Sequence, residues 1–349
     1  MYNIDKDFDT ISENFKKIKT LSPIIEQVAK ICVESIKNGG KVMFCGNGGS
    51  AADSQHLAAE LVGRYKMNRP ALNSVALTTD TSILTAVGND FGYDTIFERQ
   101  VEGIGNKGDV LVGLSTSGNS KNVLLAMDKA KSKGIKTVAM TGEKGGLMKQ
   151  KADYAINVPS DTTNHIQEMH IAVGHILCGI IEKECSPKIK ALFLDRDGTI
   201  NEDYGYTYET EKFKFVDGIL DLCKKALNKN FKIFVITNQS GVERGYYSLA
   251  QMNHFNDFMK EQFAKHDIEI TDVYSCPYLD HPDRKPSPGM FLKAKERYNI
   301  DMEYSISVGD KERDVEAALN AGVGRCFLLN EKSVESRGIV VSKLTDIDF

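Results

Sequence analysis

The chain has 349 residues and a formal net charge of -4, and its calculated pI is about 6.0. This length is sufficient for two domains that each bury a full core. Lysine and arginine are spread along the chain without a basic block, which argues against a nucleic-acid-binding or membrane-surface protein. No apolar run approaches the roughly 18 residues of a membrane span, and no basic segment followed by an apolar one begins the sequence. We therefore expect neither a membrane span nor a secretory signal.

The seven cysteines lie far apart and form no C-x-x-C pair. Most of them stand within apolar runs, which favours reduced thiols in a protein core over disulfides or a metal site. We therefore expect a cytoplasmic protein.

The first half of the chain alternates between helical and strand patterns. Residues 8–38 carry apolar side chains at helical spacing, interrupted at Pro23. Short continuous apolar runs follow, each typical of a strand buried on both faces: KVMFCG, SVALTT, DVLVGLS, KTVAMT and YAINVP. Helical stretches separate most of these runs, and a long helix over about residues 163–184 closes this half. The alternation predicts a parallel sheet with helices on both faces.

The same pattern restarts after the short polar segment CSPKIK, which contains Pro187. Strands are predicted at KALFLD, FKIFVIT, DVYSCP, YSISVGD and RCFLL, with helices near residues 217–229, 247–265, 288–299 and 312–321. We therefore predict two α/β domains, residues 1–186 and 187–349, each a doubly wound parallel sheet. Ligands of such sheets bind beyond the carboxyl ends of the strands, which is where the polar motifs of this chain fall.

Three polar loops follow strand ends in the first half: GNGGS, TTDTS and STSGNS. A glycine turn before a helix, and a serine-rich loop without lysine, both suit a phosphate monoester. Each loop alone is equally explained by ordinary turn and capping chemistry. Two such loops at one sheet edge favour a phosphosugar site.

Four side chains of the first half are candidates for chemistry at this site. His56 and Glu60 share a helix face because they are four residues apart, and Gln167 and His175 face broadly the same way on the long helix. The set could bind a divalent metal such as zinc. It could equally form an acid–base pair for proton transfer, and the spacing leaves both readings open.

The motifs FCGNGGSAADSQHLAAELVGRY, VGNDFGYDTIFERQV, STSGNS and IQEMHIAVGHIL resemble the phosphoheptose isomerases of the sugar isomerase (SIS) superfamily, over about residues 1–186. This resemblance implies a flavodoxin-like SIS sandwich and a homotetramer with active sites between subunits. It implies isomerisation of sedoheptulose 7-phosphate to D-glycero-D-manno-heptose 7-phosphate, with Glu60 as the base and His175 as acid/base. It also implies His56, Glu60, Gln167 and His175 as zinc ligands. The implied substrate-binding positions are Asn47, Gly48, Gly49, Asn89, Asp90, Ser115, Thr116, Ser117, Ser120 and Gln167.

The second half contains LFLDRDGTI, which places Asp195 and Asp197 directly after an apolar strand. One carboxylate can attack phosphorus to form an aspartyl-phosphate while the other protonates the leaving oxygen. The concentrated negative charge there suits Mg²⁺ with oxygen ligands. Later strands end at Thr237 and Asp310, and Lys285 can neutralise a transferring phosphoryl group. These features predict a magnesium-dependent phosphatase.

The order D-x-D-G-T, strand–Thr, Lys-Pro and G-D-K-x-x-D resembles the haloacid dehalogenase (HAD) superfamily over about residues 189–330, which implies a HAD-like Rossmannoid fold. The segments NEDYGYTYETEKFKFVDGI, TNQSGVERGYY and RKPSPGMF are similar to the D-glycero-D-manno-heptose 1,7-bisphosphate 7-phosphatases. The resemblance implies Asp195 as nucleophile, Asp197 as general acid/base, and Asp195, Asp197 and Asp310 as magnesium ligands. The implied substrate-binding positions are Asp203, Tyr204, Gly205, Tyr206, Thr237, Asn238, Gln239, Ser240, Arg284, Lys285 and Lys311.

Many HAD relatives carry a Cys/His zinc loop before the R-K-P segment, but this chain has only Cys276 and His281 there. We therefore expect no structural zinc in the second half. Together the resemblances imply a bifunctional enzyme that supplies nucleotide-activated heptose for surface glycans, with a heptose 7-phosphate kinase acting in trans. The alternative is a non-catalytic phosphosugar-binding SIS module fused to a phosphatase of other specificity, such as histidinol phosphate. The presence of Glu60 and His175 counts against that alternative.

Overall fold

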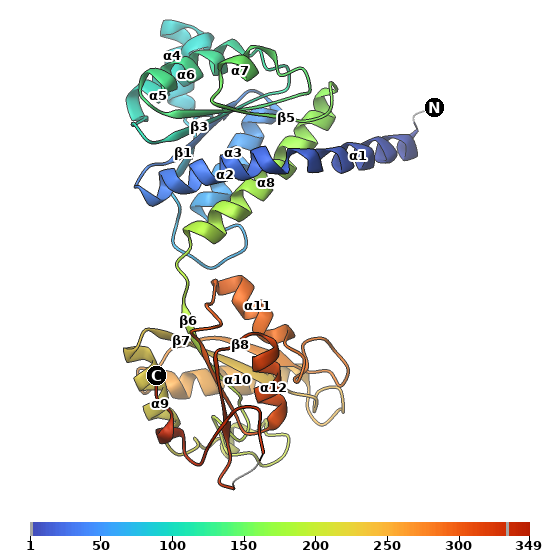
Figure 1. The fold of residues 1–349 in the computed structure, drawn as a ribbon, viewed down its shortest axis with the longest axis vertical. Coiled ribbons are helices and arrows are strands. Elements are labelled where there is room, and N and C mark those ends of the chain that lie inside the picture. Colours follow the sequence, from blue (N-terminus) through green and yellow to red (C-terminus); the bar gives the residue numbers. More distant parts are fainter. Residues whose placement is uncertain (1–2, 333–334) are drawn as a thin grey trace. The chain divides into compact units, whose positions relative to one another are not determined.

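The computed structural model describes residues 3–332 and 335–349. The chain divides into two compact units, Met1–Ser186 and Pro187–Phe349 (Figure 1). Each unit is built around one parallel sheet, as the apolar runs of the sequence predict. Within the described residues, no helix combines the length and the apolar character needed to cross a membrane.

The first unit contains a five-stranded parallel sheet in the order β2-β1-β3-β4-β5. The strands are β1 (Val42–Gly46), β2 (Ser74–Ala76), β3 (Val110–Ser115), β4 (Lys136–Thr141) and β5 (Tyr154–Asn157). The helices are α1 (Ile4–Ile18), α2 (Ser22–Lys37), α3 (Gly49–Val62), α4 (Thr81–Phe91), α5 (Ile96–Ile104), α6 (Lys121–Ser132), α7 (Gly146–Lys151) and α8 (Thr163–Cys185), with the short 3-10 helices η1 (Lys19–Leu21) and η2 (Tyr93–Thr95). Strand order reverses between β1 and β3, so a ligand site is expected at their carboxyl ends.

Alternate residues of β1 pack into two different cores of the first unit. Phe44 joins the core beneath α2, α3 and α8. Met43 and Cys45 join the core beneath α5 and α6 (Figure 1). Because side chains of a strand alternate between faces, burial on both sides makes the whole run apolar. Pro23 lies in the first turn of α2, where a proline needs no backbone donor.

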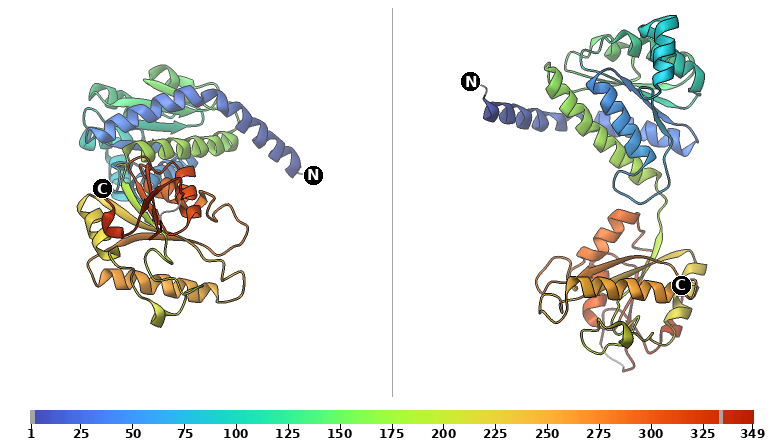
Figure 2. Two further views of the ribbon diagram at one scale, coloured as in Figure 1. Left: turned by 60° about the horizontal axis from the view of Figure 1, so that its bottom comes forward. Right: turned by 180° about the vertical axis from the view of Figure 1, so that it is seen from behind.

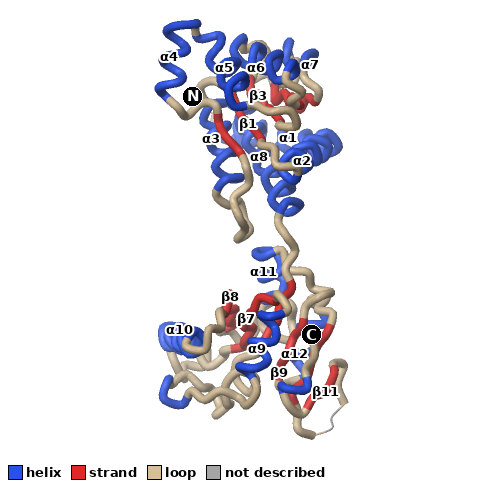
Figure 3. The backbone as a smooth tube through the Cα atoms, turned by 90° about the vertical axis from the view of Figure 1, so that its left-hand side faces the viewer, coloured by secondary structure: helices blue, strands red, loops and turns tan. Residues whose placement is uncertain are grey.

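The second unit contains a six-stranded parallel sheet in the order β11-β10-β9-β6-β7-β8. The strands are β6 (Lys190–Leu194), β7 (Phe231–Asn238), β8 (Ile270–Cys276), β9 (Ile306–Gly309), β10 (Arg325–Leu329) and β11 (Ile339–Val341), which appear as red segments in Figure 3. The helices are α9 (Ile219–Asn228), α10 (Leu249–Ala264), α11 (Gly289–Tyr298) and α12 (Glu312–Asn320), with the short 3-10 helices η3 (Thr210–Lys212) and η4 (Leu344–Asp346). The edge strand β11 is short and was not predicted from the sequence.

Helices also cover both faces of the second sheet (Figure 2). Leu192 and Leu194 of β6 pack in a core with α9 and α10, whereas Phe193 packs in a core with α11 and α12. Strand order reverses between β6 and β9. The loops that follow these two strands therefore meet at one edge of the sheet.

A buried carboxylate fixes the loop that follows α3 in the first unit. Glu182 of α8 is 1% exposed and accepts hydrogen bonds of 2.8–3.0 Å from the backbone N–H groups of residues 65–67. It also accepts one of 3.0 Å from Arg69 Nε. Arg69 in turn donates to the carbonyl oxygens of Glu60 at 2.9 Å and Leu61 at 2.8 Å. These carbonyls belong to the last turn of α3, where carbonyl oxygens have no N–H donor within the helix. Glu182 thus holds both the loop and the end of α3.

Replacing this carboxylate by an amide tests its role. We expect Glu182→Gln to lower the free energy of unfolding of the first unit by about 3 kcal/mol, because the substitution leaves the Arg69 cation buried without its partner. The amides of residues 65–67 should then exchange hydrogen faster, as measured by mass spectrometry. Glu184→Gln, an exposed carboxylate on the same helix, is the matched control. Equal exchange in both variants would contradict this role.

Candidate active sites

Two loops meet at the carboxyl edge of the first sheet, on either side of the point where strand order reverses. Residues 47–49 follow β1 and residues 115–120 follow β3. The Asn47 amide exchanges two hydrogen bonds of 2.9 Å with buried Asn122, and its oxygen accepts a bond of 3.0 Å from the Tyr93 hydroxyl. The glycine turn is therefore held in place from α6 and η2.

The serine loop presents hydroxyl and amide donors at the start of α6. Ser115 Oγ lies 2.8 Å from Ser120 Oγ, and the Asn119 backbone N–H donates to Ser117 Oγ at 3.2 Å. Gly118 has φ +67°, and a Cβ at this position would collide with the carbonyl oxygen of Gly145. The loop can close this tightly only with glycine at that position. Donors gathered at a helix start suit a phosphate group.

Two histidines and a glutamate converge between α3 and α8. His56 Nε2 lies 2.9 Å from His175 Nε2 and 3.3 Å from Glu60 Oε1. The Tyr65 ring stacks on His175, with ring centroids 5.5 Å apart. One donor atom from each of His56, Glu60 and His175 lies within 4.8 Å of the others. Two imidazole nitrogens and a carboxylate at this separation fit the donor set of zinc.

Gln167, expected as the fourth ligand, does not lie in this cluster. It is eight residues before His175 on α8, which corresponds to a rise of about 12 Å. Its amide packs instead against Gly49 at the start of α3. Asn89 and Asp90, expected to bind substrate, are exposed at the end of α4 and hydrogen-bond to each other at 2.8 Å.

Glu60 lies near the end of α3 that is opposite to the glycine turn, and His56 lies in the middle of the helix. Gly49 begins this helix, and Glu60 follows eleven residues later, a rise of about 16 Å. Within one chain the loops that suit phosphate and the candidate base are therefore far apart.

Asp53 is a further acidic residue on α3 that the sequence motifs did not indicate. It lies one turn before His56, and its Oδ2 is buried without a hydrogen-bond partner among the described residues. Burial raises the pKa of Asp53 to about 6, although nearby His56 lowers it. In the sequence, only the spacing of three residues between Asp53 and His56 indicates that the two side chains share a face of the helix.

A buried lysine organises the carboxylates of the second unit. Lys285 Nζ lies 2.8 Å from Asp195 Oδ1 and 2.7 Å from Asp314 Oδ1, and it donates to the Ile236 carbonyl at 2.6 Å. Burial raises the pKa of Asp195. Burial alone would lower the pKa of Lys285, but Asp195 and Asp314 raise it above its usual value. Lys285 is therefore a cation.

Three carboxylates surround a place that suits a metal ion. Asp195, Asp310 and Asp314 each offer an oxygen within 4.8 Å of the others. Two cations face these three carboxylates, namely Lys285 and Lys311, whose Nζ lies 2.6 Å from Asp310 Oδ2. Among the residues that the structure describes, Asp310 Oδ1 is buried without a hydrogen-bond partner. An unpaired buried carboxylate oxygen is costly without a cation, and Mg²⁺ prefers such ligands. These residues therefore fit magnesium.

Asp197, expected as a magnesium ligand, directs its carboxylate elsewhere. Its oxygens accept hydrogen bonds from Arg196 at 2.9 Å, Asn201 at 3.0 Å and Gln239 at 2.8 Å. These three donors hold the Asp197 side chain away from the carboxylate cluster. Asp314, the last residue of G-D-K-x-x-D, supplies the third carboxylate instead. Asp197 lines the cavity that opens above the cluster.

A cavity of about 340 Å³ opens above this cluster. It contains most of the substrate positions expected from the sequence and adds Arg244, Tyr247 and Arg313, which lie within the motifs but were not expected to bind substrate. The residues that line it are Asp195, Asp197, Asp203, Gly205, Tyr206, Thr237, Asn238, Gln239, Ser240, Arg244, Tyr247, Arg284, Lys311 and Arg313. Tyr204 is not among them, because its hydroxyl donates to Glu202 and its ring lines a separate hollow with residues 211–214. Lys285 is buried beneath the cavity.

Known proteins match the two halves separately. The family model for the SIS domain matches residues 8–142, and that for haloacid dehalogenase-like hydrolases matches residues 196–328. The phosphoheptose isomerase of Akkermansia muciniphila is 66% identical over 174 residues, which is 50% of this chain and 92% of that protein. The chain belongs to the phosphoheptose isomerase family.

Solved structures also match each half. The phosphoheptose isomerase of Neisseria gonorrhoeae is 42% identical, covering 51% of this chain and 96% of that one, with a TM-score of 0.49. D,D-heptose 1,7-bisphosphate phosphatase from B. bronchiseptica, solved with magnesium and phosphate, is 27% identical, covering 45% and 94%, with a TM-score of 0.41. The family models and the curated relative, taken together, confirm the resemblance of the first half to phosphoheptose isomerases and of the second half to haloacid dehalogenase-like hydrolases.

The glycine of the D-x-D-G motif provides a test of the carboxylate cluster. Gly198 has φ +88°, and a Cβ there would collide with Asp310 Oδ2. We expect Gly198→Ala to displace Asp310 and to weaken Mg²⁺ binding at least tenfold, as measured by calorimetry.

Gly322→Ala is the matched control, because Gly322 has φ +85° but no atom within 4 Å of the added methyl group. It carries the same backbone strain and should leave Mg²⁺ affinity unchanged. Equal affinity for Mg²⁺ in both variants would contradict a metal site at Asp310.

Proposed function

We propose that the first unit isomerises sedoheptulose 7-phosphate to D-glycero-D-manno-heptose 7-phosphate. The observation that carries this proposal is that Glu60, His56 and His175 lie close together. Glu60 Oε1 is 3.3 Å from His56 Nε2, and His175 Nε2 is 2.9 Å from the same atom. A carboxylate beside imidazole groups suits proton transfer between neighbouring carbons. The relatives named phosphoheptose isomerase support the choice of substrate.

In this reaction the Glu60 carboxylate removes a proton from C1 of the ketose, and after exchange of that proton with solvent the protonated Glu60 delivers a proton to C2. The intermediate is an enediol, and His175 transfers the proton between the two oxygens and assists ring opening. Tyr65, stacked on His175, keeps the imidazole plane fixed. The serine loop and the glycine turn bind the phosphate and the sugar hydroxyls.

Zinc is the metal that we propose for this site, held by His56, Glu60 and His175. When bound, it would polarise the oxygens of the sugar carbonyl and hydroxyl groups.

The isomerase site also requires a second copy of the chain. The phosphate-binding loops and Glu60 lie at opposite ends of α3, and Gln167 lies with the loops, so one chain does not unite them. α1 extends beyond the other helices of its unit (Figure 2) and exposes apolar side chains, among them Phe8 at 65%. These features support a homotetramer with active sites between subunits.

For the second unit we propose hydrolysis of the C7 phosphate of D-glycero-D-manno-heptose 1,7-bisphosphate. Asp195 attacks phosphorus, the bond from phosphorus to the sugar oxygen breaks, and Asp197 protonates that oxygen. Asp197 then accepts a proton from the water that hydrolyses the aspartyl-phosphate. Mg²⁺ held by Asp195, Asp310 and Asp314 would neutralise charge on the phosphoryl oxygens.

The cavity of the second unit favours a substrate with two phosphates. Four cationic side chains line it in addition to the buried lysine beneath: Arg244, Arg284, Lys311 and Arg313. Lys311 pairs with Asp310 at 2.6 Å, which leaves three arginines for the substrate. One phosphoryl group beside Asp195 needs fewer cations than this. The remaining charge suits a second phosphate at the other end of a sugar.

The two proposed steps are not consecutive, because the bisphosphate carries a C1 phosphate that neither unit can add. A kinase acting in trans must supply it. We propose that the enzyme is cytoplasmic, since the seven cysteines are all free thiols. The products would feed nucleotide-activated heptose for surface glycans. The lack of a structural zinc at Cys276 and His281 stays a prediction.

Two substitutions separate the proposed activities. We expect Glu60→Gln to lower isomerisation by on the order of 10²–10⁴-fold, because an amide cannot accept the proton, while phosphatase activity is retained. Asp195→Asn should abolish phosphate release and spare isomerisation. The two assays, on sedoheptulose 7-phosphate and on the bisphosphate, serve as each other's controls. Retained isomerisation in Glu60→Gln would exclude Glu60 as the base. Absence of isomerisation in the wild-type protein would favour a non-catalytic SIS module.

Mixed oligomers test whether the isomerase site is shared between copies. Glu60→Gln removes the base, and Ser120→Asp places a negative charge in the phosphate loop at a helix N-cap that tolerates aspartate. Each variant alone should be inactive. Co-expressed copies should recover roughly a quarter of the wild-type activity, because some sites receive the intact loop from one copy and Glu60 from another. No recovery in proven mixed oligomers would place the whole site in one chain.

A further inference from the structure

A second cavity in the second unit lies at the amino edge of the sheet, the edge opposite to the proposed phosphatase site. Its volume is about 260 Å³. Four of its lining residues are the first residues of four neighbouring strands: Lys190 of β6, Phe231 of β7, Ile306 of β9 and Arg325 of β10. We call it the amino-edge pocket. Its lining residues are distinct from those of the phosphatase cavity.

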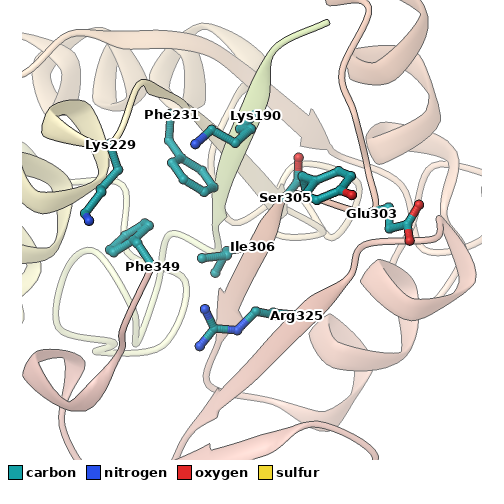
Figure 4. A pocket seen from close by; sticks show the side chains of 9 residues that line it. Lys190, Lys229, Phe231, Glu303, Ser305, Ile306, Arg325 and Phe349 are labelled. Atoms are coloured by element: carbon teal, nitrogen blue, oxygen red, sulfur yellow. The ribbon is translucent and has the colours of Figure 1, made fainter.

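Three cations border the amino-edge pocket without acidic partners (Figure 4). Among the described residues, no carboxylate oxygen lies within ion-pair distance of Lys190, Lys229 or Arg325, although many other lysines of the chain form such pairs. Lys190 Nζ lies instead 4.5 Å from the centroid of the Phe231 ring. Glu303 also borders the pocket, but Figure 4 shows it beyond Ser305, away from Lys229. Asp348 borders a neighbouring hollow with Lys229, but none of the three cations forms an ion pair within the described residues, so each is free to contact an anion.

Aromatic rings form the other part of the lining. The rings of Phe231 and Phe349 meet edge to face with centroids 5.1 Å apart, and Figure 4 shows Phe231 between Lys190 and Lys229, with Phe349 below Lys229. Tyr304 adds a third ring that is 65% exposed. Phe231 is 6% exposed and Phe349 is partly buried, so Phe349 and Tyr304 are the rings that a ligand can reach beside the cations. A simple anion would use only the charge.

We propose that the amino-edge pocket binds a nucleotide. The phosphate groups would contact Lys229 and Arg325, and the base would pack against the ring of Phe349, which Phe231 contacts from the core side. The pocket is smaller than most small-molecule sites, so part of the ligand stays in solvent and micromolar to millimolar affinity is expected. Binding here is independent of the proposed isomerase and phosphatase reactions.

Calorimetric titration of the full-length enzyme tests this proposal, with ADP as the probe and no divalent metal present. Removing the metal suppresses phosphate binding at the aspartate cluster. We expect saturable binding of ADP, at least tenfold weaker in Lys229→Ala and in Arg325→Ala. Lys232→Ala, an exposed lysine on the same strand as Phe231, and Arg244→Ala, in the phosphatase cavity, should bind ADP as the wild type does.

Two other probes separate the contributions of ring and charge. Adenosine and pyrophosphate should each bind at least tenfold more weakly than ADP. Equal affinity for pyrophosphate and ADP would make this a site for simple anions and overturn the proposal. Unchanged ADP affinity in Lys229→Ala and Arg325→Ala, or lost affinity in Arg244→Ala, would also overturn it. Phe349→Ala removes a ring of the pocket. It should lower the affinity for ADP and leave the affinity for pyrophosphate unchanged.

Discussion

In a parallel sheet whose strand order reverses, two strands that are not consecutive in the chain end side by side. Both proposed sites depend on this constraint. In the first unit it brings the loop after β1 beside the loop after β3, and in the second it brings Asp195 after β6 beside Asp310 after β9. The chemistry differs because the residues placed there differ. Serine and glycine donors suit a phosphate that stays intact, whereas carboxylates suit one that is transferred.

Charge balance then determines what the second site can hold. Lys285, buried between Asp195 and Asp314, and Lys311, paired with Asp310, place two positive charges beside three carboxylates. The excess negative charge makes a metal ion necessary for a phosphate to approach. Gly198 lets Asp310 lie close to the D-x-D-G turn, so one glycine links a backbone conformation to the metal site.

Much of the fold follows from the sequence, because strands buried on both faces read as continuous apolar runs. The strand β11 was missed since three residues give too short a pattern. Motif resemblance identified Asp195 and Glu60 as site residues, but it did not predict which carboxylates form the metal cluster. The carboxylate of Asp197 turns toward Arg196, and Asp314 joins the cluster, through contacts made by distant segments. Gln167 and His175 face broadly the same way on α8, yet about 12 Å of helix separates them.

The central claim is that one chain carries two distinct sugar-phosphate enzymes. The most direct test follows sedoheptulose 7-phosphate by proton and phosphorus NMR in D₂O, with the full-length protein, Mg²⁺, and either added zinc or none. The account predicts the aldose heptose 7-phosphate, deuterium at its C2 from exchange at the enediol, and no inorganic phosphate. Absence of the aldose under both conditions, or release of phosphate from the monophosphate, would contradict it.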